Sequence, residues 1–114
     1  MSTTDCIFCK IIAGEIPSTR VVETDNVVAF RDISPKAPVH VLVAPRTHVP
    51  NVAAAAREIP EVLAEMAVVA QQIADAECDG EYRLIFNTGE KAGQTVFHVH
   101  GHVLGGATLG WDPA

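Results

Sequence analysis

Three of the five histidines of the chain lie in one short run, His98-Val99-His100-Gly101-His102-Val103. Alternation with a period of two predicts a β-strand that carries the three imidazoles on one face and the small or apolar residues on the other. A strand rises about 3.3 Å per residue, so the outer two imidazoles would lie about 13 Å apart. Because Zn–N bonds are about 2.1 Å long, one metal ion cannot bind all three. We therefore expect the three imidazoles to have different functions.

Two of the three cysteines form a second motif, Cys6-x-x-Cys9. In a cytoplasmic chain this spacing indicates either a redox pair or half of a zinc site. A redox pair would follow a strand, and nothing apolar precedes Cys6, so we favour a metal site over the alternative of two ordinary reduced cysteines. Two histidines would complete a tetrahedral Cys₂His₂ site. The candidates are His40, His48, His98, His100 and His102; Cys78 stands alone and is expected to be passive.

Apolar periodicity predicts the elements that position these residues. The long helix has an apolar stripe that includes Val62, Met66, Val69 and Ile73, which is expected to pack on a sheet. In chain order we expect a short helix over 5–13, a hairpin of strands 20–24 and 27–31, a strand over 39–44, a long helix from near Pro60 (or a few residues earlier) to Asp79-Gly80, and strands over 82–87 and 98–103. About five strands and two helices predict an α+β fold with an antiparallel sheet. No repeat or linker divides residues 1–114, so a single domain is expected.

Composition limits the class of protein. With 114 residues, of which 48% are hydrophobic, the chain can form one compact core. No apolar run approaches 18 residues and the N-terminus has no signal-peptide pattern, so a cytoplasmic protein without a membrane partner is expected. The net charge of −6 and the pI near 5.2 argue against a nucleic-acid partner. This charge does not exclude the binding of a single phosphate by N–H groups and imidazoles.

The histidine run resembles the signature of the histidine triad (HIT) family, in which three histidines alternate with apolar residues. The resemblance covers nearly the whole chain and extends to the Hint-like branch, the purine nucleoside phosphoramidases. Its further segments are residues 6–12, 30–35, 38–40 and 93–97. One departure is Gly101, where the family has a bulky apolar residue, which should affect strand packing more than catalysis. Another is residues 110–114, where relatives often end in Trp-Pro-Pro-Gly. The resemblance implies a HIT-like fold whose two subunits pair into a homodimer with a continuous sheet.

The resemblance also implies a reaction, carried out by a nucleotidyl hydrolase. His100 would attack the phosphorus of a purine nucleoside 5′-phosphoramidate, such as adenosine 5′-phosphoramidate, and form a covalent nucleotidyl intermediate that water hydrolyses. Neutral imidazole suits this role because its pKa lies near 6.5. A backbone carbonyl on the triad strand would accept a hydrogen bond from the other ring nitrogen. His102 and His40 would donate to phosphate oxygens, and Thr95 would orient or protonate the leaving amine.

Substrate binding follows from the same resemblance. Backbone N–H groups of Gly93, Gln94 and Thr95 would contact the phosphate together with His102, Asn87 would contact the ribose or the phosphate, and Asp32 would accept the ribose hydroxyls. The purine would occupy an apolar slot formed by Ile7, Phe8, Ile11, Phe30 and Ile33. Taken singly, each of these apolar residues could be ordinary core, and Asp32 before Ser-Pro could be a turn residue. Trp111 would reach the site of the partner subunit.

For the metal, zinc-bearing HIT relatives and the related galactose-1-phosphate uridylyltransferases imply one choice among the candidate histidines. They use a Cys-x-x-Cys motif, a histidine after the third strand and the first histidine of the triad, which here are Cys6, Cys9, His48 and His98. Four protein ligands leave no open position, so such a zinc would be structural. Many Hint-like proteins lack the cysteines, so the zinc would be auxiliary. No organic cofactor is expected.

Three alternatives stay open at this point. The chain could hydrolyse dinucleoside polyphosphates, although those relatives tend to be longer and lack the N-terminal cysteine pattern. It could be a nucleotide-binding interaction module whose hydrolysis is incidental. It could also be a protein whose purpose is zinc binding, which would require His100 or His102 as ligands.

Overall fold

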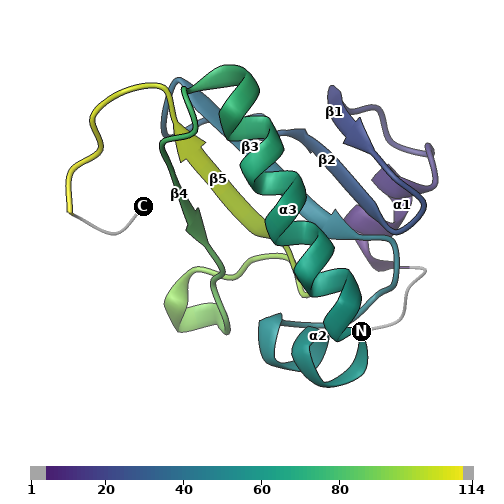
Figure 1. The fold of residues 1–114 in the computed structure, drawn as a ribbon. Coiled ribbons are helices and arrows are strands. Elements are labelled where there is room, and N and C mark those ends of the chain that lie inside the picture. Colours follow the sequence, from purple (N-terminus) through teal and green to yellow (C-terminus); the bar gives the residue numbers. More distant parts are fainter. Residues whose placement is uncertain (1–4, 112–114) are drawn as a thin grey trace.

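A computed structural model describes residues 5–111 of the chain. Five strands form one antiparallel sheet in the order β1-β2-β3-β5-β4 (Figure 1). They are β1 (Arg20–Glu23), β2 (Val27–Arg31), β3 (Val39–Pro45), β4 (Tyr82–Ile85) and β5 (Gly101–Gly105). The predicted five-stranded antiparallel sheet is therefore confirmed. The last strand in sequence, β5, lies between β3 and β4, so the histidine run ends next to the centre of the sheet.

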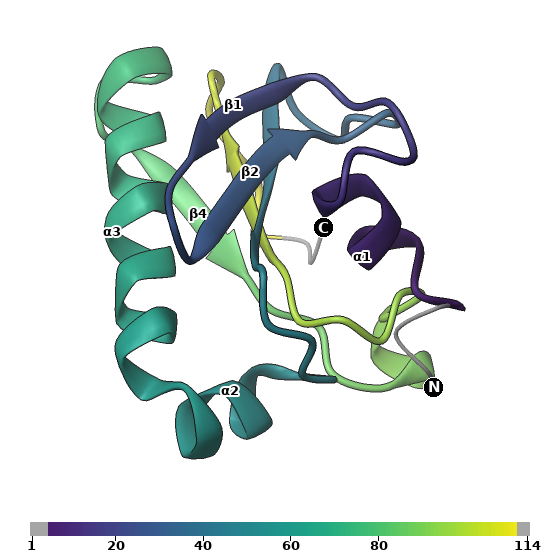
Figure 2. The same ribbon diagram turned by 90° about the vertical axis from the view of Figure 1, so that its right-hand side faces the viewer.

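Helices cover both faces of the sheet, as Figure 2 shows. The long helix α3 (Pro60–Glu77) packs on one face, and the short helix α1 (Ile7–Ile12) lies over the other. The core under α3 includes Met66, Val69 and Ile73, which belong to the predicted apolar stripe. The core under α1 joins Phe8 and Ile11 to Val28, Phe30 and Leu42. Within residues 5–111, no helix has both the length and the apolar character needed to cross a membrane.

The ends of α1 are capped by local interactions. The Cys6 Sγ accepts a hydrogen bond from the Cys9 backbone N–H at 3.3 Å, so the cysteine motif also forms the N-terminal cap. At the other end, Gly14 has φ +83°, and the N–H groups of Gly14 and Glu15 donate to Ile11 and Lys10. This is a Schellman motif, which favours glycine because of its positive φ. The predicted short helix is present, and its position places both thiols over the sheet.

The region before the long helix differs from the prediction. A separate helix, α2 (Val52–Glu58), is capped by the side chain of Asn51, which accepts from the Ala54 N–H at 2.9 Å. Ile59 then leaves the helical region with φ −137° and ψ 55°, and Pro60 begins α3. Proline disfavours helical geometry in the residue before it and suits the first position of a helix. The described chain therefore has three α-helices where two were expected. A short 3₁₀ helix (Glu90–Ala92) adds a further turn.

The histidine run is a strand only in its second half. The predicted strand was 98–103, whereas β5 begins at Gly101 and the pairing with β3 ends where Gly101 meets Val43. Before that point the chain leaves the sheet, and the Val99 N–H donates to the Val49 carbonyl. Val99 packs with Val49 and residues of α2. The 4-residue strand β4 also ends at Ile85, two residues before Asn87.

Gly101 lies where β5 passes close to side chains of the neighbouring chain segment. A Cβ added there would come within 2.9 Å of Leu84 Cδ1 and 3.0 Å of Phe86 Cζ. These two side chains occupy the space that a bulkier residue would need. The departure at Gly101 thus concerns packing between β5 and the chain of β4, as expected. The other departure, at residues 110–114, lies partly outside the described residues, and the single domain over 1–114 stays a prediction.

Candidate active site and metal cluster

His100 is positioned by the backbone of the residue two before it. Its Nδ1 lies 2.8 Å from the His98 carbonyl oxygen. A carbonyl only accepts, so Nδ1 carries the proton and Nε2 has a free lone pair. The half-buried ring packs edge-on against Phe8, with ring centroids 4.8 Å apart. Burial lowers the pKa of His100, opposed by the His98 carbonyl and by Asp32, so the ring is neutral at neutral pH.

His40 and His102 form a hydrogen-bonded pair across β3 and β5. The His40 Nε2 and the His102 Nδ1 are 2.9 Å apart, and Asp32 Oδ2 lies 3.4 Å from the same His40 nitrogen. Burial lowers the pKa of His40, and Asp32 opposes this. Burial, together with the nearby His100 and His40, lowers the pKa of His102 to about 4. We refer to His40, His100 and His102 as the three-histidine group.

A cavity of about 670 Å³ opens beside this group. This volume lies in the range of small-molecule sites. Its lining contains nine of the residues singled out from the sequence, namely Ile7, Phe8, Ile11, Phe30, Asp32, Ile33, Thr95, His100 and His102. The lining also includes residues that sequence reasoning missed, namely Pro17, Ser18, Thr19, Arg31, Leu42 and Val96. Of these, Leu42 could have been found, because it follows His40 by two residues on the same strand face.

Two lining residues illustrate how local structure and site overlap. Asp32 Oδ1 accepts a hydrogen bond from the Ser34 N–H at 2.7 Å, so Asp32 does form a turn. It lines the cavity nevertheless, with its other oxygen near His40. The side chain of Ile33 is 98% exposed although it is large and apolar. An exposed isoleucine at the mouth of a cavity offers apolar contact to a ligand, because nothing in the described chain covers it.

The loop before the histidine run differs from the expected phosphate-binding loop. The N–H of Gly93 donates to the Glu90 carbonyl and that of Gln94 to the Gly89 carbonyl, each at 3.0 Å. Both groups are therefore engaged within the loop, because the turn ending at Gly93 (φ +94°) folds the chain back on itself. Gly93, Gln94 and Asn87 are not among the described residues that line the cavity. Of the three residues predicted to supply these N–H groups, Thr95 is the one that lines the cavity.

The side chain of Gln94 faces inward and holds this loop. Gln94 is 3% exposed. Its Oε1 accepts from the Gly89 N–H at 2.9 Å, and its Nε2 donates to the carbonyls of Pro50 (2.6 Å) and Val96 (3.1 Å). A buried amide with its donors and acceptor paired stabilises the loop that carries Thr95. Gln94 therefore has a structural role in this loop rather than a contact with the substrate.

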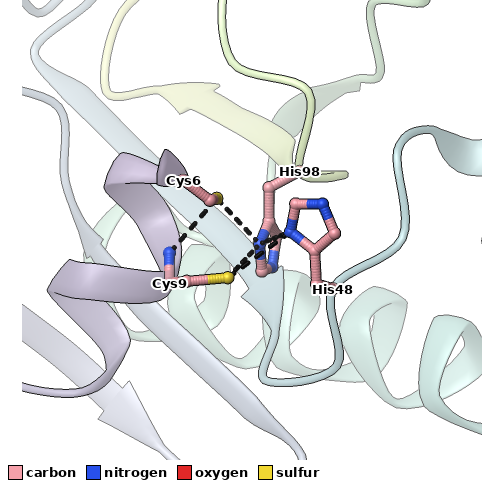
Figure 3. Close-up of side chains that lie close together, drawn as sticks. All are labelled: Cys6, Cys9, His48 and His98. Carbon is pink, nitrogen blue, oxygen red and sulfur yellow. Dashed lines mark hydrogen bonds between the residues drawn. The ribbon is translucent and has the colours of Figure 1, made fainter. Parts of the chain in front are cut away.

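Four side chains from three segments converge on a second centre, as Figure 3 shows. The cysteine–histidine cluster consists of Cys6 and Cys9 of α1, His48 after β3, and His98. Neighbouring Sγ and Nδ1 atoms lie 3.4–3.5 Å apart, and the two Nδ1 atoms are 3.2 Å apart. A tetrahedral zinc with bonds of about 2.3 Å to sulfur and about 2.1 Å to nitrogen places two nitrogens about 3.4 Å apart and a nitrogen and a sulfur about 3.6 Å apart. The donor set and its spacing fit zinc.

The surroundings of this cluster favour a cation. His98 is fully buried, and its Nε2 donates to the Pro45 carbonyl at 2.7 Å, which leaves the Nδ1 lone pair facing the cluster. Burial, with the neighbouring Cys6, raises the pKa of the Cys9 thiol to about 11. Without a cation the thiolate is therefore disfavoured, and a bound cation would reverse that balance. Cys78 lies apart from both centres, as the C-terminal cap of α3.

Comparisons with known proteins show the family of this chain. A family model described as "HIT domain" matches residues 13–109. The purine nucleoside phosphoramidase of Escherichia coli (strain K12) is 48% identical over 108 residues, which are 93% of this chain and 91% of that protein. The solved structure of a HIT family hydrolase from Legionella pneumophila Philadelphia 1 has a TM-score of 0.91 and 44% identity over 96% of this chain and 100% of that one.

A third relative bears on the metal. A Zn-bound histidine triad family protein from Mycobacterium smegmatis has a TM-score of 0.78 and 36% identity, with 91% of this chain and 76% of that chain covered. The family match itself begins at residue 13, after Cys6 and Cys9. The cysteine pair is therefore outside the matched region, and its geometry is the argument for metal in this chain.

Proposed function

The chain belongs to the HIT family and is a hydrolase, and from this premise we propose that it cleaves the P–N bond of purine nucleoside 5′-phosphoramidates through a covalent intermediate on His100. The observation that carries the proposal is the hydrogen bond from His100 Nδ1 to the His98 carbonyl. It leaves the Nε2 lone pair of a neutral ring for attack, in a residue that lines the cavity.

The reaction has two displacements at phosphorus. His100 Nε2 forms a bond to phosphorus while the P–N bond of the substrate breaks. The electron pair of the P–N bond leaves with the amine, which takes up a proton from water in the cavity. Thr95 lines the cavity and has a hydroxyl that can orient this amine. A water molecule then attacks phosphorus and loses a proton to the solvent, the bond to His100 breaks with its electron pair returning to Nε2, and a nucleoside monophosphate is released. His102 donates a hydrogen bond to a phosphate oxygen on which charge accumulates.

Nucleoside recognition uses the rest of the cavity. Asp32 accepts the ribose hydroxyls, and the purine lies between apolar side chains such as Phe8 and Phe30 and the exposed Ile33. An apolar slot contacts the faces of a planar base and discriminates only modestly between adenine and guanine. The contact of Asn87 with the ribose or phosphate stays a prediction from the sequence, because Asn87 does not line the cavity. Two chains are expected to pair into a homodimer, which the molar mass by light scattering tests.

Zinc is proposed as a structural ion in the cysteine–histidine cluster. Cys6, Cys9, His48 and His98 would hold it, and with four protein ligands it has no position for substrate. It would bind α1, which carries cavity residues Phe8 and Ile11, to the segment of His98. The zinc would therefore stabilise the fold around the cavity rather than take part in the reaction.

The test compares the wild-type protein with His100→Ala on adenosine 5′-phosphoramidate, with Cys78→Ser as a matched control away from both centres. We expect release of AMP and amine by the wild type and the control, and a loss of about 10³-fold or more in the variant. Rapidly quenched wild-type protein should carry one nucleotidyl group by intact mass, and His100→Ala none. Equal activity of wild type and His100→Ala would refute the mechanism. Hydrolysis of dinucleoside polyphosphates alone, or AMP binding without turnover, would refute the proposed reaction.

A further inference from the structure

A chain of hydrogen bonds runs from the backbone of the loop before β3 to the cavity. The backbone N–H of Lys36 lies 3.0 Å from His40 Nδ1, and His40 Nε2 lies 2.9 Å from His102 Nδ1. A backbone N–H can only donate, so His40 Nδ1 must accept and carries no proton. The backbone at Lys36 thus determines which nitrogen of His40 is protonated.

The proton positions of the two rings follow in sequence. Burial lowers the pKa of both His40 and His102, so both rings are neutral at neutral pH. A neutral imidazole without a proton on Nδ1 carries it on Nε2. His40 Nε2–H therefore donates to His102 Nδ1, with Asp32 Oδ2 also on this side at 3.4 Å. His102 in turn carries its own proton on Nε2, its remaining polar atom, and His102 lines the cavity.

We propose that the Lys36 backbone N–H is a positioning group that makes His102 a permanent hydrogen-bond donor to the substrate phosphate. The opposite holds for His100, whose Nδ1–H is bound to the His98 carbonyl and whose Nε2 is a lone pair. Two neighbouring rings, with centroids 5.0 Å apart, thus present one nucleophile and one donor without any change of charge. The effect on rate rests on the proposed function; the proton positions do not.

The same proton positions exclude a metal from a site that otherwise looks suitable. Asp32, His40 and His102 place ligand atoms within 4.8 Å of one another. A metal bound to His40 Nε2 would require the proton on Nδ1, where it would face the Lys36 N–H at 3.0 Å. Two donors would then point at each other, which costs the hydrogen bond and adds repulsion. Of the two groups of possible ligands within residues 5–111, the cysteine–histidine cluster is the one suited to metal.

The direct test is ¹⁵N NMR of the imidazole nitrogens in the uniformly labelled full chain at neutral pH, without substrate. We expect His40 and His102 as neutral Nε2–H tautomers and His100 as the neutral Nδ1–H tautomer. An Nδ1–H tautomer or a doubly protonated ring at His40 or His102 would overturn the proposal. Because this measurement needs no turnover, it decides the proton positions even if the protein does not hydrolyse phosphoramidates.

A pair of nearly isosteric variants tests the consequence. In His40→Gln the amide can accept from Lys36 and donate to His102, whereas the carboxylate of His40→Glu can only accept. We expect His40→Gln to keep the Nε2–H tautomer of His102, and His40→Glu to move a proton to His102 Nδ1 and to lose about 10²-fold more kcat. The same His102 tautomer and the same kcat in both variants would contradict the proposal. If His40→Glu does not fold, the wild-type spectrum alone decides.

Discussion

Two groups of histidines lie next to each other in this protein, and they differ in what their ring nitrogens face. In the cysteine–histidine cluster, the Nδ1 atoms of His48 and His98 converge with two thiols, and every donor atom points to one centre. In the three-histidine group, the rings are bound to the backbone or to one another, and one nitrogen of His100 and of His102 is left toward the cavity.

The difference shows that the neighbours of an imidazole determine its chemistry. A converging set of lone pairs is favourable only around a cation, whereas a directed set of hydrogen bonds holds a neutral ring in one tautomer. His98 belongs to both arrangements, because its side chain joins the cluster while its carbonyl accepts from His100. We expect the cysteine–histidine cluster to affect mainly stability and the three-histidine group to affect mainly rate. The predictions below on metal loss and on His102 test that division.

Loss of the proposed zinc ion is expected to have the largest effect. Cys6→Ser keeps the helix cap, for which serine is well suited, and removes one thiolate. With free zinc at about 1,000 times its Kd, binding stabilises the fold by about 4 kcal/mol. We therefore expect Cys6→Ser, or chelation of the wild type, to lower Tm by about 10–20 °C. Differential scanning calorimetry and zinc analysis measure this, with Cys78→Ser as the control.

The division also limits what metal loss does to catalysis. Because the His98 ring keeps its hydrogen bond to Pro45, its carbonyl stays in place for His100. We expect kcat/KM of chelated protein, measured well below its Tm, to fall by less than about 10-fold. A loss of more than about 100-fold would place the cluster in the catalytic machinery.

His102→Ala is expected to have the next largest effect, and mainly on rate. Removing one donor to a developing charge costs about 10²-fold in kcat, which is about 2.7 kcal/mol. Zinc content should stay close to that of the wild type, because His102 makes no bond within the cluster. Steady-state kinetics and zinc analysis on the same sample check both expectations. Loss of zinc from this variant would show that the two groups are not independent.

The pH dependence of stability should be smaller and has a definite sign. Burial, His100 and His40 lower the pKa of His102 to about 4, while Asp32 opposes them. Between about pH 6.5 and about 4, the unfolded chain therefore binds a proton at this residue that the folded chain does not. Stability should fall as the pH decreases through this window, and by less in His102→Gln. Urea unfolding of both proteins checks this; equal pH slopes would contradict a buried neutral His102.

Ile33→Ala is expected to have the smallest effect. Its side chain is 98% exposed, so its truncation should leave Tm unchanged, but it lines the cavity. Loss of part of an apolar contact with the purine should raise KM about 3- to 10-fold. Val68→Ala, at an exposed position of α3, is the matched control and should change neither quantity. An unchanged KM for Ile33→Ala would remove this residue from the base slot.

The sequence by itself determined the local features of this protein. Apolar residues mark the five strands and the long helix, because these are the residues that the fold buries, along one stripe of α3 and along the whole of β3. The spacing of the histidine run and of Cys6 and Cys9 indicated two kinds of chemistry. The sequence also accounts for the break between α2 and α3, since Pro60 disfavours helical geometry at Ile59.

The tertiary structure decided which of these residues meet. Cys6 and His98 are 92 positions apart, and residue types alone left the two histidine partners of the cysteines open. Whether an N–H group is free, as was expected for Gly93 and Gln94, depends on the carbonyl that the folded loop brings to it. The proton order of His40 and His102 likewise follows from the Lys36 N–H. Hydrogen-bond satisfaction depends on three-dimensional neighbours, which no local pattern contains.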